Sequence, residues 1–156
     1  MAEVAGSSPR PGLRKNRRNA IRKHLSVKWG ERLGREECPY LRRWGIVAGA
    51  FSVRVHHFYR SDDARFHHDH PWWFLTIVLK GGYTDSSEQG EDHLRAGSIR
   101  FRSATHRHTV FTDPGGVWTL ILTGPNTRTW GFWVNGKFKK ANKYFFEHGH
   151  HPCDQL

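Results

Sequence analysis

Two pairs of histidines are the part of this sequence whose residue types and spacing could do chemistry. The first pair is His68 and His70, and the second, about forty residues later, is His106 and His108. Alternate side chains of a β-strand point to the same side, so each His-x-His pair would present both imidazoles to one face. Two such pairs on neighbouring strands could supply three or four nitrogens to one divalent ion, and imidazole suits zinc, iron, copper and nickel. The spacing therefore predicts a metal site.

A different pair of side chains in the first segment could be the ligands instead of His68 and His70. His67 and Asp69 have the same alternate spacing but point the opposite way, and with a distal histidine they would form the two-histidine, one-carboxylate set of the 2-oxoglutarate oxygenases. The odd positions from Trp73 to Leu79 are somewhat more apolar than the even ones, which favours this second register. However, Pro71 can reset the register through a bulge, and a barrel interior that holds a site can be its more polar face. The histidine pair stays preferred.

Composition indicates one folded domain. The chain has 156 residues, of which 37% are hydrophobic, with seven Trp and ten Phe, which is more than a disordered chain carries. It has neither a signal-peptide pattern nor an apolar run of the roughly 20 residues that span a bilayer. Its two cysteines, Cys38 and Cys153, do not suggest a disulfide framework. We therefore expect a soluble protein in a reducing compartment, the cytoplasm, or the host cytoplasm if a phage encodes it.

The basic residues are concentrated in an N-terminal arm, residues 1–35. This arm has ten Lys/Arg and two acidic residues, whereas the net charge of the whole chain is +11. Leu13 to Arg35 could form a basic helix, and the residues before it are expected to be disordered. Residues 10–35 could form a solvated tail or contact nucleic-acid phosphates without sequence preference, and an Arg-rich transit peptide is a third alternative, which Glu3 disfavours. The arm residues predicted to make such contacts are Arg14, Lys15, Arg17, Arg18, Arg22 and Lys23.

From Tyr40 onward the pattern is that of an all-β protein. We expect about eight to ten short strands, because apolar and polar residues alternate between clusters of turn-forming residues. Turn signals include Gly81-Gly82 and the strong Asp113 to Gly116, and Asn135-Gly136 is a tight hairpin signal. The pattern predicts an antiparallel sandwich or barrel over residues 36–140 and a C-terminal extension, 141–156, that begins with a short helix.

The histidine pairs and the strand order resemble a cupin, the double-stranded β-helix or jelly-roll barrel. The first cupin motif is met by His68, His70 and a glycine at 81 or 82, but Phe74 or Leu75 stands where the motif has glutamate. The second motif is met at Gly97 and His108, while its Pro, Gly and Asn are replaced by Ser103, Thr105 and Thr112. The resemblance covers roughly Tyr40 to Val134, and the chain is also similar to small, uncharacterised cupin-like proteins of bacteria and phages.

The resemblance implies metal ligation by His68, His70 and His108. A three-histidine set resembles that of the thiol dioxygenases, cupins that use mononuclear ferrous iron. Three neutral ligands leave open positions on the ion and its full positive charge, which favours an anionic substrate. His106 could be a fourth ligand or lie beside the site, and His56 or His57 could enter it. The residues expected to bind the substrate are Arg100, Arg102, Arg107, Trp72 and Phe74.

Two classes of function follow from these residues. The first is a mononuclear non-haem Fe(II) dioxygenase-like enzyme for a small anionic substrate, with zinc, manganese or nickel as other metals for the site. The second is a non-catalytic barrel that binds a small ligand or has a structural role, associated with nucleic acid through the arm. Either protein could be a homodimer, and neither is expected at a membrane.

Overall fold

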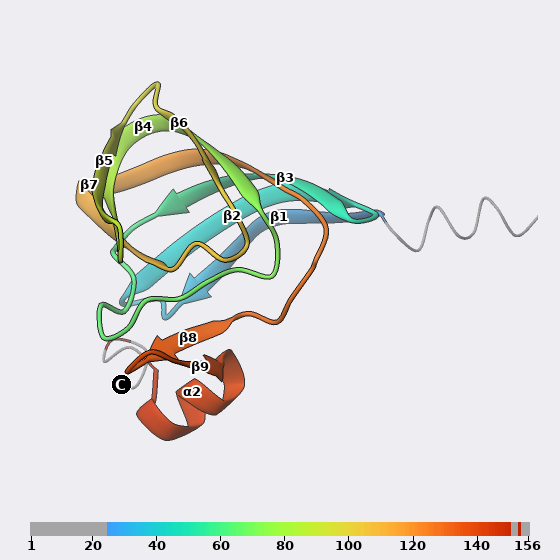
Figure 1. The fold of residues 1–156 in the computed structure, drawn as a ribbon. Coiled ribbons are helices and arrows are strands. Elements are labelled where there is room, and N and C mark those ends of the chain that lie inside the picture. The colour runs from blue at the N-terminus through green and yellow to red at the C-terminus, as the bar shows by residue number, and fades with distance from the viewer. Residues whose placement is uncertain (1–24, 151–152, 154–156) are drawn as a thin grey trace, which may run out of the picture.

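The computed structural model describes residues 25–150 and residue 153 of the chain. Within them lie nine strands and one helix (Figure 1). In chain order these are β1 (Leu25–Gly34), β2 (Pro39–Ala48), β3 (Phe51–Phe58), β4 (Phe74–Ser87), β5 (Gly90–Arg95), β6 (Ile99–Arg102), β7 (His108–Thr123), β8 (Gly131–Val134), β9 (Lys137–Lys140) and α2 (Ala141–His148). The prediction of an all-β fold is confirmed.

Seven of the strands form one antiparallel sheet. Its order is β1-β2-β3-β7-β4-β5, and β6 pairs with the first part of β4, on the same edge as β5. The remaining strands, β8 and β9, form a hairpin with α2 packed beside it. Figure 1 shows the sheet curling over, with this hairpin and helix below its open end. The long strands β4 and β7 are paired along most of their length and connect the two halves of the curled sheet.

The first strand corrects the prediction for the arm. Residues Leu25–Gly34 pair with β2 as an edge strand, so the basic helix predicted over Leu13 to Arg35 is wrong in its described part. The sheet therefore begins inside the segment that we assigned to the arm. The six basic residues predicted to contact nucleic acid lie between positions 14 and 23, outside the described residues, and their role stays a prediction.

Two of the predicted turns are wrong, because they lie inside long strands, whereas the predicted Asn135-Gly136 hairpin is confirmed between β8 and β9. Gly81-Gly82 is within β4 and the Asp113 to Gly116 segment is within β7, where the pairing of the two strands shifts register. Gly81 and Gly116 have φ of +78° and +77°. A side chain on Gly81 would begin only 2.3 Å from the Gly116 carbonyl oxygen. Glycine is needed here so that two paired strands can bend together.

Replacing Gly116 with alanine should therefore destabilise the fold. A Cβ there would lie 2.1 Å from the Phe58 carbonyl oxygen, in addition to the strain of a positive φ. We expect the free energy of unfolding, measured by urea titration, to fall by at least about 3 kcal/mol. Gly115 is a matched control, because its φ is +90° but a Cβ added there would have no atom within 4 Å, so its alanine variant should lose only about 1 kcal/mol. Equal losses would contradict the steric argument.

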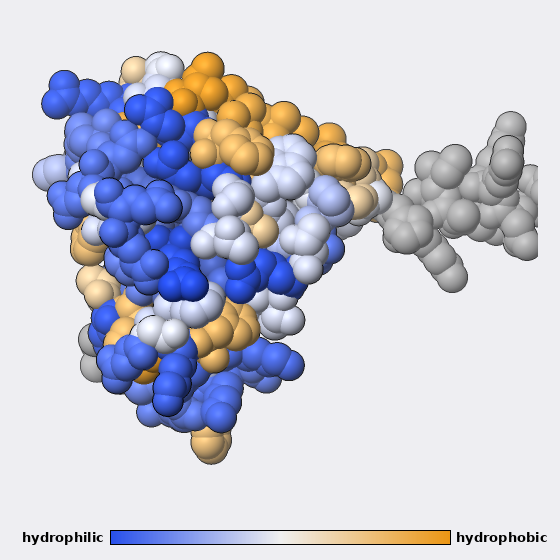
Figure 2. Space-filling view, in the orientation of Figure 1, coloured by the Kyte–Doolittle hydropathy of each residue, from blue (hydrophilic) through white to orange (hydrophobic). Residues whose placement is uncertain are grey.

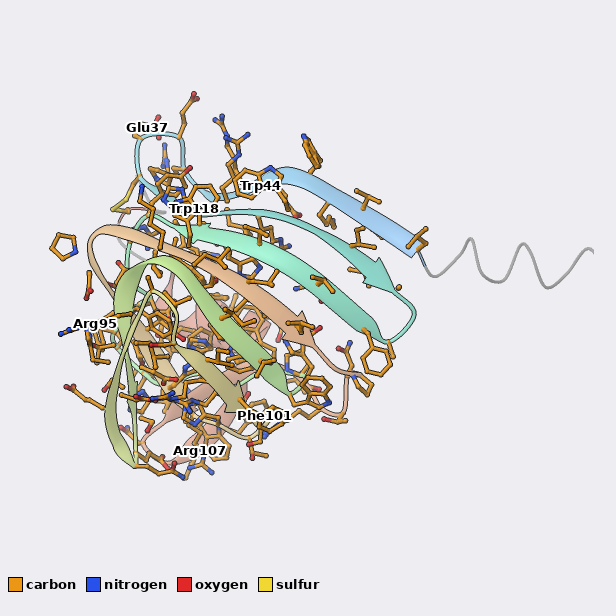
Figure 3. The ribbon with its side chains drawn as sticks, turned by 90° about the horizontal axis from the view of Figure 1, so that it is seen from above. Glu37, Trp44, Arg95, Phe101, Arg107 and Trp118 are labelled. Carbon is orange, nitrogen blue, oxygen red and sulfur yellow. A yellow bond between two sulfur atoms is a disulfide. The ribbon has the colours of Figure 1, made fainter. Side chains whose placement is uncertain are left out.

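The sheet has an unusual distribution of polarity. On β4, Phe74, Thr76 and Val78 face the interior and are 7%, 3% and 2% exposed. The more apolar positions, Leu75 and Ile77, face outward and pair with other apolar residues on β6 and β7. The stacked rings of Trp44 and Trp118, with centroids 5.6 Å apart, lie on the outer face (Figure 3). Apolarity alone thus points to the wrong face of this strand.

Two apolar clusters lie on either side of the interior. One joins β4, β5 and β7 through Val78, Tyr83, Leu94 and Val117. The other joins the hairpin to α2 through its own buried residues, Phe132, Val134, Ala141 and Tyr144. Backbone hydrogen bonds join His68 to His108 of β7 and His67 and Asp69 to β8, so this part of the chain is held between β7 and the hairpin.

The two cysteines correct another expectation. Cys38, just before β2, is joined by a disulfide to Cys153 beyond α2, across 115 residues of sequence. Disulfides persist mainly in oxidising environments, so the argument from the cysteines to a reducing compartment no longer holds. No helix among the described residues is long and apolar enough to cross a membrane.

Candidate metal centre

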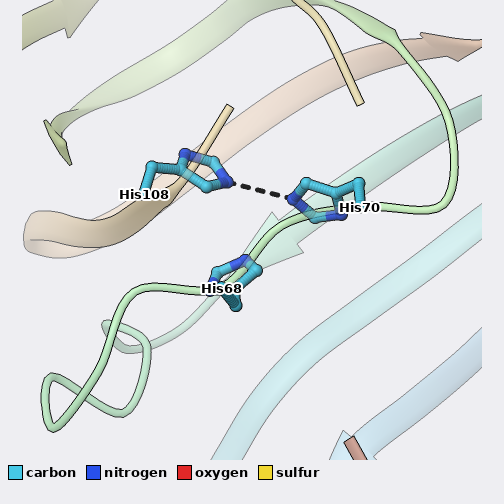
Figure 4. A group of neighbouring side chains, drawn as sticks. All are labelled: His68, His70 and His108. Atoms are coloured by element: carbon cyan, nitrogen blue, oxygen red, sulfur yellow. Dashed lines mark hydrogen bonds between the residues drawn. The ribbon is translucent and has the colours of Figure 1, made fainter. Parts of the chain in front are cut away.

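Three of the predicted histidines converge at one point. Nitrogen atoms of His68, His70 and His108, one from each ring, all lie within 4.8 Å of one another. The Nε2 atoms of His70 and His108 are 3.0 Å apart (Figure 4). His108 is buried, and the other two are partly buried. The structure thus brings together the ligand set that the cupin resemblance implies.

Backbone pairing positions these three rings. His68 and His108 exchange two backbone N–H···O bonds of 2.9 Å, so the start of β7 is paired with the segment that precedes β4. The same stretch of chain bonds to the hairpin, where the Trp133 amide donates to the His67 carbonyl. Because the backbone is extended there, His68 and His70 project to one side, where the side chain of His108 also lies. The arrangement does not depend on flexible loops.

The spacing of the nitrogens fits a shared metal ion. Two imidazole nitrogens bound to one ion at about 2.1 Å and at right angles would be about 3.0 Å apart. The Nε2 atoms of His70 and His108 have that separation. The alternative for these two atoms is a hydrogen bond from one imidazole to the other. That alternative does not account for His68, whose ring centroid lies 5.0 Å from that of His70 and 4.8 Å from that of His108.

Asp85 fixes the orientation of His108. Its carboxylate, on β4, accepts hydrogen bonds from His108 Nδ1 at 3.0 Å, His106 Nε2 at 3.1 Å and Arg102 Nε at 2.9 Å. Burial alone would raise the pKa of Asp85, but these hydrogen bonds outweigh it and hold the pKa well below its usual range. A carboxylate that holds Nδ1–H leaves Nε2 of His108 as the basic nitrogen, the arrangement common behind metal-bound histidines.

The same carboxylate gives a second group that could hold an ion. Oxygen and nitrogen atoms of Asp85, His106 and His108 lie within 4.8 Å of one another. Arg102 already occupies this carboxylate with a positive charge, which opposes a cation at the same place. We therefore favour the three-histidine group. His106, the predicted fourth ligand, is placed behind His108 against Asp85 and is not brought into the three-histidine group.

A second carboxylate lies behind His68. Oδ2 of Asp62 is 3.7 Å from Nδ1 of His68. Asp62 is itself held by the Val110 amide, which donates to Oδ2 at 2.8 Å, and by the hydroxyl of Tyr40. Two of the three histidines thus have a buried acid on the side away from the shared point. Such acids add negative charge that favours a cation among the rings.

The environment keeps the imidazoles of His68 and His70 neutral. Burial lowers the pKa of His68 to about 4, an effect that Asp62 partly offsets. Burial, together with the neighbouring His68 and His108, lowers the pKa of His70 well below its usual value. Neutral imidazole is the form that binds metal. Both rings are therefore ready to act as ligands at neutral pH.

The three histidines border a cavity of about 120 Å³ inside the curled sheet. An engineered apolar cavity of about 150 Å³ holds one benzene, so this one suits a molecule of about six non-hydrogen atoms. Trp72 and Phe74, predicted to bind substrate, both line it. Other parts of its wall come from β3, β4 and β7, at Arg54, His56, Phe58, Thr76, Tyr83, Val110, Val117, Thr119, Ile121 and Thr123, with Tyr40 and Asp62 closing the side by His68.

The side chains of the alternative ligand pair, His67 and Asp69, point away from the cavity. Oδ2 of Asp69 accepts a hydrogen bond from Trp133 Nε1 and forms an ion pair with Arg128, both at 2.9 Å. His67 is within hydrogen-bonding distance of the Thr109 hydroxyl. Asp69 is fully buried in these contacts, and neither residue lines the cavity. The structure does not bring His67 and Asp69 to the shared point.

The three arginines predicted to orient a substrate lie away from this cavity. Arg100 pairs with Asp92, and Arg102 pairs with both Asp92 and Asp85. Arg107 pairs with Glu88 and lies over the Trp133 ring, with its guanidinium carbon 3.3 Å from the ring centroid. None of the three is part of the cavity wall, and Figure 3 places Arg107 at the rim beside the β4–β5 hairpin.

Sequence reasoning missed the arginine and the two acids of the site. Arg54 lines the cavity from β3, and Asp62 and Asp85 support the histidines. Aspartate is depleted in strands, so Asp85 within a β-patterned segment was an available signal. Of the two candidate histidines of β3, His56 lines the cavity, whereas His57 stacks on Trp118 of the outer face with centroids 4.3 Å apart.

Burial of His56 should make stability fall at acid pH. Burial, with Arg54 and Arg43 adding to it, lowers the pKa of His56 to about 3. Between pH 6.5 and 3 the unfolded chain binds a proton there and the folded chain does not, so acid favours unfolding. From this residue we expect a loss of about 2.5 kcal/mol in the free energy of unfolding at pH 4.5 relative to pH 7.5. Over the same pH range, the free energy of unfolding of a His56→Gln variant, measured by urea titration, should fall by about 2.5 kcal/mol less than that of the wild type. If the two proteins lost stability equally as the pH falls, the assignment to His56 would be contradicted.

Comparison with known proteins addresses the fold. No protein-family model matches the chain, and no curated protein sequence matches it. An RmlC-like cupin from Shewanella frigidimarina NCIMB 400 matches with a TM-score of 0.51 and 15% identity, over 67% of this chain and 96% of that one. The chain has a cupin fold.

A second structure agrees with this cupin fold. The DMSP lyase DddQ from Ruegeria pomeroyi DSS-3 matches with a TM-score of 0.50 and 17% identity, over 67% of this chain and 58% of that one. In another DMSP lyase structure the match covers 47% of the known chain. This protein therefore spans less than two thirds of the length of these lyases, and the likeness concerns the barrel.

Proposed function

We propose that this protein is a metal-dependent enzyme of the dioxygenase type that acts on a small molecule bound in the barrel cavity. His68, His70 and His108 would hold the ion, with Fe(II) as the first choice and zinc, manganese or nickel as others. The observation that carries the proposal is the convergence of three imidazoles on a cavity of about 120 Å³. A structural site would be closed by four ligands, whereas three ligands beside a cavity suit chemistry.

The bound ion would supply a positive charge and open positions beside the cavity, where substrate and dioxygen could react. Where both oxygen atoms enter one substrate, that substrate supplies all four electrons and no separate reductant is needed, whereas in a coupled reaction 2-oxoglutarate supplies two of them. The chain's own contribution is to hold the imidazoles and exclude water. Asp85 fixes the ring of His108 through Nδ1, and Asp62 lies behind His68. The apolar side chains of Phe74, Val110 and Val117 form much of the wall and keep water from the reacting groups.

Oxygen uptake by metal-loaded protein tests this function. Protein purified without a polyhistidine tag would be loaded anaerobically with Fe(II), and oxygen consumption would be followed with small thiols, phenolics and substrates coupled to 2-oxoglutarate. We expect uptake with one class and none with zinc-loaded protein, because zinc has no redox chemistry. A tightly bound ion without oxygen uptake in any class would favour the non-catalytic barrel and reject the proposal.

A further inference from the structure

The cavity wall contains a cation, Arg54, that has no counter-ion among the described residues. Arg54 is half-buried on β3, and no carboxylate of the described residues forms an ion pair with it. Its guanidinium carbon lies 5.2 Å from the centre of the Trp72 ring. Glu31 is the one carboxylate with an electrostatic effect on the pKa of Arg54, but it forms its ion pair with Arg43. Arginine stays charged at neutral pH, so this part of the wall is positive.

Two further polar groups of the same wall lack partners. His56 and Thr119 face each other across the β3–β7 pairing, and both line the cavity. Nε2 of His56 and Oγ1 of Thr119 are buried and make no hydrogen bond within the described residues. Thr119 is 1% exposed. Buried polar atoms are normally satisfied, and an unsatisfied one costs about 1–3 kcal/mol, so two in one cavity indicate a ligand that bonds to them.

These groups lie close to the candidate metal centre. The Trp72 ring, over which Arg54 lies, is also 6.3 Å from the His70 ring, measured between centroids. Arg54 and His70 thus both lie beside the Trp72 ring, and both line the same cavity. In the part of the chain that the structure describes, no other arginine and no lysine lines the cavity. One charged group and a small volume suit a monoanion with a short apolar body better than a phosphate.

We propose that Arg54, His56 and Thr119 form a carboxylate-binding subsite that orients a small organic acid toward the three histidines. Arg54 would form paired hydrogen bonds with the carboxylate, and the other two residues would each contribute one from the wall. The apolar part of the acid would then contact Phe74, Val117 and Ile121. This inference rests on the proposed function for the role of the substrate, but carboxylate binding itself can be measured without turnover.

Binding of butyrate and butyramide tests the subsite. Both molecules have about the size that the cavity admits, and they differ in charge. Ligand-observed NMR and tryptophan fluorescence would be measured on the full chain, metal-free and zinc-loaded. We expect butyramide to bind at least tenfold more weakly than butyrate. Arg54→Gln should weaken butyrate at least tenfold and remove this preference, Arg54→Lys should be intermediate, and Arg95→Gln, at an exposed position, should match the wild type.

Metal content separates the two proposals. Arg54→Gln should keep the wild-type zinc content while losing butyrate, and His70→Ala should lose zinc while retaining butyrate in the metal-free form. If Arg54→Gln does not fold, Thr119→Val removes only a hydroxyl and should weaken butyrate about threefold. Equal binding of butyrate and butyramide, tighter binding of inorganic phosphate, or unchanged butyrate affinity in Arg54→Gln would overturn the subsite while leaving the metal proposal intact.

The outer face of the sheet carries a second, independent feature. The strand pairings place apolar residues in two rows that cross it from edge to edge. One row is Val27, Ile46, Val53, Leu122, Leu75 and Phe101, and the other is Trp44, Val55, Leu120, Ile77 and Ile99. Figure 2 shows apolar residues gathered along the upper edge of the molecule, over the sheet. Neither row contains a charged side chain.

We also infer that a second copy of this chain covers this face. Ile46 and Val53 are 50% and 49% exposed, and Phe101 is 59% exposed. Five of the eleven residues are 49–62% exposed and the other six are partly buried, so the face presents on the order of several hundred Å² of apolar surface. The largest patch of a typical monomer is about 300–600 Å², whereas a stable interface takes about 800 Å² from each partner. An apolar face whose rows hold no charged side chain fits a copy of itself.

Analytical ultracentrifugation of the full chain tests this pairing. We expect a dimer for the wild type and a monomer for Ile46→Glu and Val53→Glu, with unchanged circular dichroism. Phe146→Glu is the matched control, because Phe146 is an apolar residue of α2 that is 91% exposed and lies away from this face, so this variant should stay dimeric. A monomeric wild type, with the face covered by residues 1–24 or by another protein, would overturn the inference, as would a dimer that persists in both sheet variants.

Discussion

Replacing His70 with alanine is expected to lower the affinity for a divalent metal at least about 100-fold. Each of the three imidazoles supplies one nitrogen, and even residues behind a ligand affect affinity about 10–100-fold. The Nε2 atom of His70 is 3.0 Å from that of His108, so its loss would remove one of the two nearest nitrogens of the group. Elemental analysis after dialysis against limiting zinc, with competition by a chelator, would measure the change. His108→Ala should have at least as large an effect.

His67→Ala is the matched control for this prediction. His67 is a neighbouring histidine, but it points away from the cavity to the Thr109 hydroxyl. Its loss should leave the metal affinity within about twofold of the wild type. If His67→Ala lost metal and His70→Ala retained it, the ligands would belong to the alternative register with Asp69, and the three-histidine site would be rejected.

The ligand histidines could be found from the sequence because their spacing is local. His68 and His70 share a side of any extended backbone, whatever fold surrounds them. Their neighbour His108 was reached through the cupin resemblance, and the structure shows the pairing of His68 with His108 that brings it there. The Fe(II) preference and the reaction rest on the ligand set and stay proposals.

The apolar pattern of β4 was misleading for a physical reason. Leu75 and Ile77 are more apolar than Phe74 and Thr76 as a set, yet they face outward. Strand parity identifies the buried face only when the other face meets water. Here the interior holds a polar site and the outer face is apolar, so the usual inference is reversed. The glycines of β4 and β7 were misread for a related reason, because a bend within paired strands and a chain-reversing turn use the same residues.

The arginine of the cavity could not be identified without tertiary structure. Arg54 lies far in sequence from the histidines, and only the β3–β7 and β4–β7 pairings place it on the same wall as Thr119 and Phe74. Arg100 and Arg102 were nearer in sequence to the second histidine pair, but nearby carboxylates neutralise them. Charge balance in the folded protein, rather than distance along the chain, decides which arginine is available to an anion.

Asp85→Asn is expected to weaken both the metal site and the fold. The carboxylate of Asp85 is 2% exposed and accepts from His108, His106 and Arg102 at once. An amide of the same shape can donate to an imidazole nitrogen, so it no longer requires Nδ1 of His108 to carry the proton. We expect metal affinity to fall about 10–100-fold. The free energy of unfolding should fall by about 3 kcal/mol, because the charged Arg102 loses its buried partner.

Asp92→Asn is the control that isolates the role of the buried acid. Asp92 also pairs with Arg102, at 2.8 Å, but its side chain is 34% exposed and does not touch His108. Its loss should cost less than about 1 kcal/mol, as for other exposed ion pairs, and should leave metal affinity unchanged. Metal competition and urea unfolding of both variants would be compared. Equal metal affinity in Asp85→Asn and Asp92→Asn would mean that the orientation of His108 does not depend on Asp85, and that backbone pairing with His68 alone fixes this ring.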